Sequence, residues 1–456
     1  MKDLNSQKYI FEEMPVGAAV RKLAFPAVVS QIILVIYNMA DAYYVGLTDS
    51  DAMLTAVTIC MPAFMFLSAI ANLFGVGGSS AVSRALGRKD VKHANRASAF
   101  AFWGCFWLAI IYMLGVLTFR HGFINVLGGT HTDVHLYASG YMKYAVIIGA
   151  VPTCLASFFA HMVRSEGRSL QASFGIMLGG VLNMLLDPLF MFVILPRGNE
   201  ATGAAIATML SNIISLCYYV VIIGKYRGSS ALNFSFTREC LGEGIPFEVI
   251  SIGLPACLMT LCENVSYAVL DKLMSLKGLS MQAGVGIAKK VNMLAHSIAR
   301  GISQGVLPLI AYNYAAKNYD RMKRTIIISE ITEVSVAALC TVISLAFAPQ
   351  LIGIFIDSGA ASHGFGVTFL RILCIGGPFS ACAYGFISFF QATGHATTSL
   401  MLALMRKGIL DIPLMFILNS VMPMTGIVWA TPIADMACCV TAIAFFIFFL
   451  RNIETE

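Results

Sequence analysis

Two acidic residues, Asp41 and Asp187, lie inside strongly apolar stretches of the first half of the chain. Tyr37 precedes Asp41 by four residues, so the two share a face if the stretch is helical. Asn183 stands in the same relation to Asp187. An acid inside a membrane-spanning helix costs about 2.5–3.5 kcal/mol on insertion scales and is by default a functional hypothesis. Carboxylate, amide and phenol oxygens together suit a hard cation such as Na+, or a shared proton.

The two acids are expected at the same depth in a membrane. Counted from Leu23 and Leu170, near the start of the two stretches, a rise of about 1.5 Å per residue puts both about 26 Å from the inner boundary. They could therefore meet, with Ser157 as a further ligand. Pro188 removes the N–H that would bond the Met184 carbonyl, so that oxygen is either another ligand or the mark of a kink. The alternative is that one acid only satisfies backbone groups in a helix bundle.

The composition indicates the elements that must position these residues. Of 456 residues, 58% are hydrophobic and 12% are charged, and the mean hydropathy is +0.79. Soluble domains carry about 25% charged residues, so a polytopic helical membrane protein is expected. The net charge of +6 resides largely in short connections between apolar runs, which argues against a nucleic-acid partner. Twelve spans are predicted, at about 22–46, 52–77, 97–119, 136–163, 170–195, 201–224, 249–276, 281–312, 325–356, 366–392, 400–420 and 425–450.

The connections indicate an orientation and an internal repeat. Four of the five connections that precede the odd-numbered spans from the third onward are basic, which predicts that they and both termini are cytoplasmic. The spacing from Pro26 to Asp90 is close to that from Pro255 to Asp320. A parallel repeat is therefore expected, with the substrate between the halves. The predicted parts are an N-lobe (1–224), a cytoplasmic linker (225–248) and a C-lobe (249–456).

The second half contains a further embedded acid, Glu263, with Asn264 beside it. It could line the substrate path, form part of a second ion site, or be a single hydrogen-bonded acid. The candidate partners for it in the eighth span are Lys289, Lys290 and Arg300. Near the C-terminus, a structural pair of Asp435 with Arg406 is favoured over a role in transport, and Asp411 is another candidate.

Other chemistries find little support in the sequence. No GxxxxGK[ST] motif is present, so the chain has no P-loop of its own for ATP. The glycine pattern Gly75–Ser80 follows an apolar helix, which favours close helix packing over nucleotide binding. The twelve cysteines show neither zinc spacing nor a disulfide framework. His161 and His296 lie in spans, where packing is a commoner role than proton relay. No cofactor is expected apart from a coupling ion.

Six segments spread over nearly the whole chain resemble one known family. They are FPAVVSQIILVIYNMADAYYVG, MVRSEGRSLQA, GGVLNMLLDPLF, GISQGVLPLIAYNYAAKNYDRMKR, FFQATGHATTSLMLALMRKGILDIP and GIVWATPIAD. Together they resemble the multidrug and toxic compound extrusion (MATE) transporters. The resemblance implies twelve helices in two pseudo-symmetric six-helix lobes around a central cleft. It also implies export of organic cations, dyes and antibiotics, driven by inward flow of H+ or Na+.

The resemblance also extends to individual residues. The motifs around four of them resemble the N-lobe cation site of the DinF-like branch: Tyr37, Asp41, Asn183 and Asp187. Glu263 resembles the acid on the seventh helix of the NorM branch, which pairs it with an aspartate on the tenth helix. Here the segment 376–392 has no acid. An N-lobe site with H+ or Na+ at the two aspartates is therefore favoured over a C-lobe sodium site.

The expected protein is a monomeric antiporter of the plasma (inner) membrane that exports organic cations and drugs, and not an enzyme. One alternative is a lipid-linked-precursor flippase of the same superfamily. Such a protein needs a strongly basic cleft, whereas the embedded basic residues are few here. The other alternative is an integral membrane enzyme, which needs catalytic groups gathered in a loop. Only one loop could supply them, through His121, His131, Asp133 and His135.

Overall fold

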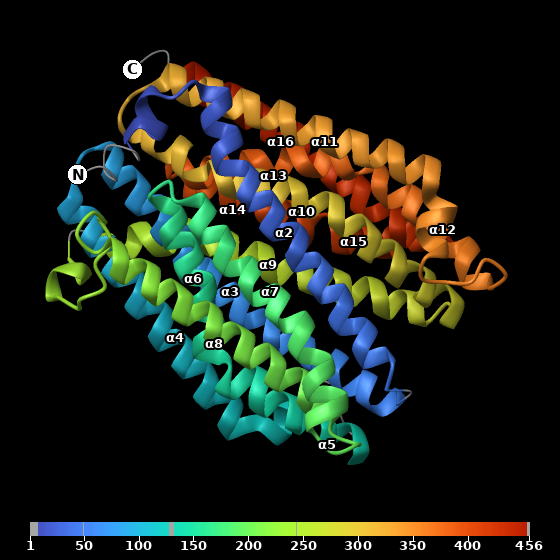
Figure 1. Ribbon diagram of the computed structural model, residues 1–456. Helices are drawn as coiled ribbons and strands as arrows, with labels where there is room; N and C mark the ends of the chain where they lie inside the picture. Colours follow the sequence, from blue (N-terminus) through green and yellow to red (C-terminus); the bar gives the residue numbers. More distant parts are fainter. Residues whose placement is uncertain (1–7, 49, 127–131, 243, 454–456) are drawn as a thin grey trace. The chain divides into compact units, whose positions relative to one another are not determined.

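The structure is a computed structural model and describes residues 8–48, 50–126, 132–242 and 244–453. The predicted all-α class is confirmed, since long helices make up nearly all of the described chain (Figure 1). Among the described residues, eight helices are long and apolar enough to cross a membrane, and two bent helix pairs bring the number to ten. The two other predicted spans fall on α10 (Leu279–Ala315) and on α14 (Ala396–Leu404), η5 (Met405–Ile409) and α15 (Asp411–Val421).

The chain forms two compact units. The first consists of the residues up to Met14 together with Ile33–Gly253, and the second of Pro15–Ile32 together with the residues from Leu254 onward. The helix α2 (Val16–Gly46) is therefore shared: its first part belongs to the second unit and its last part to the first. The predicted lobe and linker boundaries at residues 224 and 248 stay a prediction.

Each unit is built from helices that correspond to the predicted spans. The first unit contains the end of α2, α3 (Asp51–Gly87), α4 (Val91–Val126), α5 (Thr132–Tyr141), η2 (Met142–Ile148), α6 (Ala150–Ser165), α7 (Ser169–Pro188), η3 (Leu189–Ile194) and α8 (Glu200–Tyr226). The second contains the start of α2, most of α9 (Ile245–Ser275), α10, α11 (Tyr319–Gly353), α12 (Ala361–Ile375), α13 (Gly377–Thr393), α14, η5, α15 and α16 (Gly426–Ile453). The fourth span bends by 47° between η2 and α6, and the tenth by 43° between α12 and α13.

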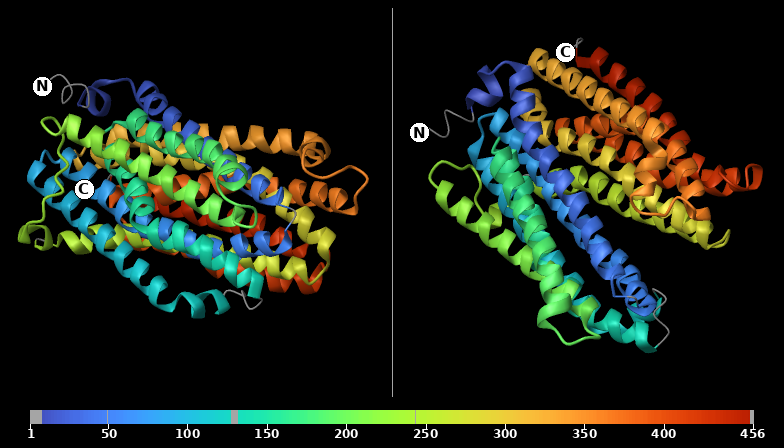
Figure 2. Two further views of the ribbon diagram at one scale, coloured as in Figure 1. Left: turned by 60° about the horizontal axis from the view of Figure 1, so that its bottom comes forward. Right: turned by 45° about the vertical axis from the view of Figure 1, so that its right-hand side comes forward.

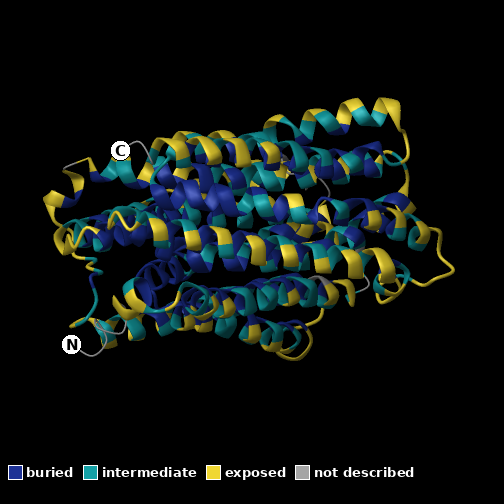
Figure 3. Ribbon diagram, turned by 90° about the horizontal axis from the view of Figure 1, so that it is seen from above, coloured by how far each residue is buried: buried dark blue, intermediate teal, exposed yellow. Residues whose placement is uncertain are grey.

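Burial follows the helix faces. Within each unit the helices run side by side over much of their length (Figure 2). Buried residues line the faces that pack together, and exposed ones lie on the outward faces (Figure 3). Large apolar side chains are common among the exposed ones: Phe25 is 70% exposed, Val193 73% and Phe247 78%. In a chain of this hydropathy such outward faces suit a lipid environment, where the helix backbone satisfies its own hydrogen bonds.

Close backbone packing explains the glycine pattern at Gly75–Ser80. The segment lies within α3 and follows no strand. A Cβ on Gly77 would lie 2.0 Å from the carbonyl oxygen of Val249, at the start of α9. One on Gly253 would lie 1.7 Å from the carbonyl oxygen of Leu73. These two glycines therefore let α3 and the start of α9 touch through their backbones, as small residues do between membrane helices.

The Gly77→Ala variant is expected to destabilise the protein by about 1–3 kcal/mol, because the added methyl group must push two backbones apart. The apparent melting temperature of purified protein in detergent measures the effect. Gly115→Ala on α4 is the matched control, since a Cβ there meets nothing within 4 Å. That variant is expected to melt at the wild-type temperature or slightly above, because alanine has a higher helix propensity than glycine. Equal melting of both variants would contradict the proposed contact.

A second close contact holds the first part of α2 in the second unit. A Cβ on Gly301 of α10 would lie 2.6 Å from the Cα of Val28, and one on Gly305 would lie 2.7 Å from the Cα of Ala24. The two glycines are four residues apart, so they form one small-residue stripe on α10. The Gln31 side-chain amide also donates a hydrogen bond of 3.1 Å to Gln304.

Candidate functional site

Close packing of α2 against α7 brings the first pair of predicted residues near the second. Gly180 on α7 has no side chain at the crossing, and a Cβ there would lie 3.1 Å from Ile33 Cγ2 and 3.4 Å from Tyr37 Cδ1. Asp41 follows one turn after Tyr37 on α2, and Asp187 lies about two turns after Gly180 on α7. The glycine therefore sets the distance between the two helices that carry the acids.

The resulting site is buried. Asp41 is 7% exposed, Asn183 2% and Asp187 0%. The Asn183 amide donates hydrogen bonds to Asp187 Oδ1 at 3.3 Å and to Thr208 Oγ1 on α8 at 3.2 Å. Asp41 and Asp187 are close enough to interact electrostatically. Two carboxylates, an amide and a hydroxyl thus come together from α2, α7 and α8 in a site withdrawn from solvent.

Two phenols border the acids. Tyr37 interacts electrostatically with both Asp41 and Asp187. Tyr141, at the end of α5, also interacts with both and is 2% exposed. The oxygens around the two acids therefore come from four helices. Such a set can ligate a small cation or hold a proton between the carboxyl groups.

Two members of the site, Thr208 and Tyr141, escaped sequence reasoning. Thr208 stands in the run GAAIATMLS of α8, and a hydroxyl residue is ordinary in a membrane helix. Tyr141 is one of 16 tyrosines and has no distinguishing spacing. Ser157, which the sequence analysis added to the set, is half-buried on α6 and forms no hydrogen bond with it in the described part of the chain. A π-helical segment begins directly after Pro188, while the role of the Met184 carbonyl stays a prediction.

If the site binds the H+ or Na+ expected from the sequence, the Thr208→Val variant should lower the apparent affinity for that ion about fivefold. Valine keeps the shape of threonine but removes the acceptor that α8 offers to the Asn183 amide, and a net hydrogen bond contributes about 1 kcal/mol. The ion dependence of drug export measures the change. Thr58→Val is the matched control, since the Thr58 hydroxyl lies on an exposed face and donates to the Leu54 carbonyl of its own helix. A wild-type ion dependence in Thr208→Val would show that this hydroxyl does not support the site.

In the second unit, Glu263 forms an ion pair. Its Oε2 accepts a hydrogen bond of 2.9 Å from Nη2 of Arg300. Asn264 donates to the carbonyl of Thr260 in its own helix. Lys290 is half-buried on the same helix as Arg300, while the neighbouring lysine, Lys289, pairs with Asp271 at 2.6 Å. The acid on the seventh span is therefore already compensated by a cation.

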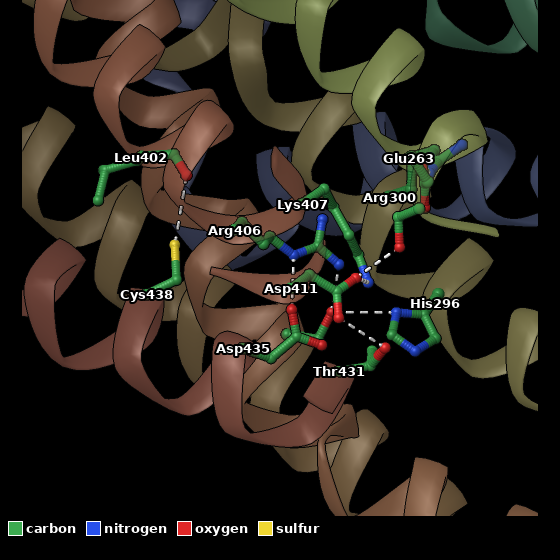
Figure 4. A network of polar contacts seen from close by, with 12 residues as sticks. Glu263, His296, Arg300, Leu402, Arg406, Lys407, Asp411, Thr431, Asp435 and Cys438 are labelled. Atoms are coloured by element: carbon green, nitrogen blue, oxygen red, sulfur yellow. Dashed lines mark hydrogen bonds and ion pairs between the residues drawn. The ribbon is translucent and has the colours of Figure 1, made fainter. Parts of the chain in front are cut away.

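Two further ion pairs lie deeper in this unit, and their side chains point toward one another (Figure 4). Arg406 Nε donates to Asp435 Oδ1 at 2.9 Å, and the two side chains are 2% and 1% exposed. Lys407 Nζ lies 3.3 Å from Asp411 Oδ2, and Thr431 donates to the other oxygen of Asp411 at 3.0 Å. The pair of Arg406 with Asp435, expected from the sequence, is present.

His296, on α10, borders a small pocket. His296 Nδ1 lies 3.0 Å from the hydroxyl of Ser380, which also accepts a hydrogen bond from Arg406. His296, Arg300, Arg406, Ser380 and Tyr384 all line the pocket. Each of the two arginines that line the pocket pairs with an acid, Arg300 with Glu263 and Arg406 with Asp435.

The structure describes three of the four residues that the sequence analysis named for a catalytic loop, namely His121, Asp133 and His135. His121 Nδ1 lies 2.8 Å from His135 Nε2, on exposed surface. His131 lies outside the described residues. Where the structure describes the chain, no group of three or more His, Cys, Asp or Glu side chains is placed to hold a metal ion.

Apolar helices in two units, with acidic side chains buried in their interiors, are typical of a polytopic membrane transporter. The chain belongs to the MatE family, whose model matches residues 26–189 and 255–417. The family resemblance seen in the sequence is thereby confirmed. One match falls in each half, in line with the predicted duplication.

Known relatives extend over the whole chain. The multidrug export protein MepA of Staphylococcus saprophyticus is 28% identical over 452 residues, covering 99% of this chain and 97% of that protein. MepA of Staphylococcus aureus strain NCTC 8325 is 28% identical over 458 residues, with the same coverage.

Solved structures share the fold. A multidrug resistance MATE family transporter of the MOP superfamily, in an outward-facing conformation, matches with a TM-score of 0.91 at 20% identity, covering 100% of this chain and 99% of that one. A MATE structure in complex with MaL6 matches with a TM-score of 0.90 at 21% identity and 99% coverage of both chains. These matches support the two-lobe, twelve-helix architecture that the sequence predicts.

Proposed function

We propose that the protein is a secondary active efflux transporter that exports organic cations and drugs in exchange for H+ or Na+ bound at Asp41 and Asp187. The proposal rests on one observation: the two acids are buried close to each other, and Asn183 donates hydrogen bonds to Asp187 and Thr208. An ion from outside the cell binds there and stabilises one arrangement of the surrounding helices. The MepA relatives, which are named as multidrug export proteins, support drugs as the exported class.

The coupling follows from differential binding. An ion can shift a conformational equilibrium only as far as its affinities for the two states differ. A carboxylate pair that closes around the ion in one state and opens in the other supplies that difference. By reciprocity, the cargo that favours the opposite state lowers the affinity for the ion.

A binding site for the driving ion at Glu263 in the second unit is less well supported than the site at Asp41 and Asp187. A sodium ion at Glu263 would compete with the guanidinium of Arg300 at 2.9 Å. The segment 376–392 supplies no second acid. A site in the first unit therefore accounts better for ion coupling, and the paired charges of the second unit suit a structural role or a place along the substrate path.

The direct test is drug efflux from vesicles on which the sodium and proton gradients are imposed independently. Efflux that follows one gradient and is insensitive to the other identifies the ion. Efflux that follows neither gradient would refute the proposal. The matched variant is Asp133→Asn, which removes an exposed acid at the start of α5 and should leave efflux unchanged.

The proposal includes an orientation. Both termini lie in the cytoplasm of a plasma (inner) membrane, because the basic connections do, and the protein acts as a monomer. Expression in a drug-sensitive bacterium then raises resistance to cationic antibiotics. Labelling of a cysteine introduced near either terminus by a membrane-impermeant reagent, in intact cells, would contradict this orientation.

A further inference from the structure

A second pair of buried acids lies in the second unit, on α11. Glu330 and Glu333 are three residues apart and so lie on one helical face. They are 9% and 1% exposed. Neither belongs to the site of Asp41 and Asp187 or to the network around Arg406. The helices α10 and α13 pack against α11 in this unit (Figure 1).

The environment of Glu330 supplies almost no stabilisation for a negative charge. Both of its carboxylate oxygens are fully buried, and among the described residues they have no hydrogen-bond partner beyond the nearby thiol of Cys382. A thiol is only a weak donor. The other groups that interact with Glu330 electrostatically are Glu333 and Cys439, and neither is a cation.

Glu333 is little better compensated. Its Oε2 accepts one hydrogen bond of 2.9 Å from Ser303 on α10, and it interacts with Tyr384 on α13. α13 carries no charged residue at all. Arg300 on α10 is bonded to Glu263, and Arg371 on α12 is exposed. The titratable groups that face the two glutamates are therefore the thiols of Cys382 and Cys439 and the phenol of Tyr384. Each glutamate also faces the carboxyl group of the other.

The fold makes room for this carboxyl group. A Cβ on Gly385 would lie 2.1 Å from Glu330 Oε1. Only glycine at this position lets the acid lie against the backbone of α13. Glu330 therefore occupies a recess fitted to it, and an unpaired acid is held in the interior of the unit where a single charge would cost several kcal/mol.

Two neighbouring carboxylates without a cation cannot both stay ionised at such a site. Like charges at short range repel, and burial adds to the cost of each. We propose that Glu330 and Glu333 form a proton-binding site in the second unit, in which a proton keeps at least one carboxyl group neutral at neutral pH. This gives the second unit a proton of its own, separate from any ion at Asp41 and Asp187.

Infrared spectroscopy of purified protein at neutral pH tests the proposal, because a protonated carboxyl group has a C=O stretch distinct from that of a carboxylate. The starting protein is the Asp41→Asn, Asp187→Asn variant, which removes the acids of the first unit. Adding Glu330→Gln and Glu333→Gln is expected to remove absorbance equivalent to about one carboxyl group. Asp320→Asn, on an exposed position of the same helix, should remove none. If the two glutamine substitutions remove no such absorbance, the proposal is overturned.

A sodium titration at constant pH separates a proton from a metal cation. The band assigned to the pair is expected to stay unchanged, whereas its loss on adding NaCl would overturn the proton site in favour of a sodium site. Because all measurements use resting protein without drug or gradient, they are independent of whether Asp41 and Asp187 drive transport.

A second variant covers the case in which the glutamine substitutions prevent folding. Gly385→Ala keeps both acids but forces the Glu330 carboxyl group out of its recess. The C=O band is then expected to shift in frequency while its area is retained. An unchanged band in a folded Gly385→Ala protein would show that the band does not arise from Glu330, and would overturn a proton site that this carboxyl group shares with Glu333.

Discussion

Replacing Asp187 by Asn is expected to abolish drug export while the protein stays folded. Asparagine keeps the size of the side chain and a hydrogen bond with Asn183, but it can neither carry a negative charge nor take up a proton at neutral pH. The loss in initial efflux rate should be about 100-fold or more, because the proposed coupling ion would lose one of its two carboxylate ligands. Asp41→Asn should have the same effect, since the two acids act on one ion.

Cells that express each variant at equal levels provide the measurement, through drug resistance and the rate of dye efflux. Folding is checked by gel filtration and by the apparent melting temperature. The exposed acid Asp133 supplies the control, and Asp133→Asn should retain the wild-type rate. Full efflux by folded Asp41→Asn protein would refute the mechanism. Equal loss in the Asp133 variant would show that the assay responds to any removal of an acid.

The Arg406→Met variant is expected to destabilise the second unit strongly, by about 3–5 kcal/mol. It leaves Asp435 buried at 1% exposure without its cation, and an uncompensated buried charge carries most of that penalty. It also removes the hydrogen bond from the guanidinium to Ser380. The measurement is the apparent melting temperature, together with the fraction of protein that remains monodisperse after heating.

A charge-balanced double variant sharpens this test. Arg406→Met with Asp435→Asn removes both charges, so it should recover a substantial part of the stability that Arg406→Met alone loses. Arg371→Met removes an exposed cation from α12 and should change the melting temperature little. If the double variant is as unstable as the sum of its single changes, the ion pair is not what stabilises this part of the unit.

The sequence predicted most of the helices because hydropathy is a strong signal in a membrane protein. All twelve predicted spans have helical counterparts. The details within the spans were beyond the sequence. The bends after η2 and after α12 occur inside continuous apolar stretches, where only packing distinguishes a bent helix from a straight one. The division of α2 between the units likewise depends on contacts with α10 that no local pattern records.

The sequence predicted those site residues that carry a charge within an apolar span, because burying a charge there is costly. Asp41 and Asp187 stand out because an acid in an apolar span needs a reason. Thr208 was missed because hydroxyl residues are common in membrane helices and do not by themselves indicate a site. Glu330 and Glu333 were missed for a different reason: they lie near the start of a span whose first turns are rich in charge, so the sequence does not distinguish them from solvated residues. Their burial became apparent only from the packing of α10 and α13.

The shared helix α2 has a consequence for dissecting the protein. A gene fragment that begins at α9 would encode a bundle with an open furrow along α10, at Gly301 and Gly305, where Val28 and Ala24 normally fit. Such a half-molecule lacks the first part of α2, residues 15–32, which belongs to the second unit but lies more than 200 residues before α9 in the sequence. Co-expression with a separate polypeptide that carries residues 15–32 would be needed to complete it. The second unit is therefore complete only with residues 15–32, which precede nearly all of the first unit in the sequence.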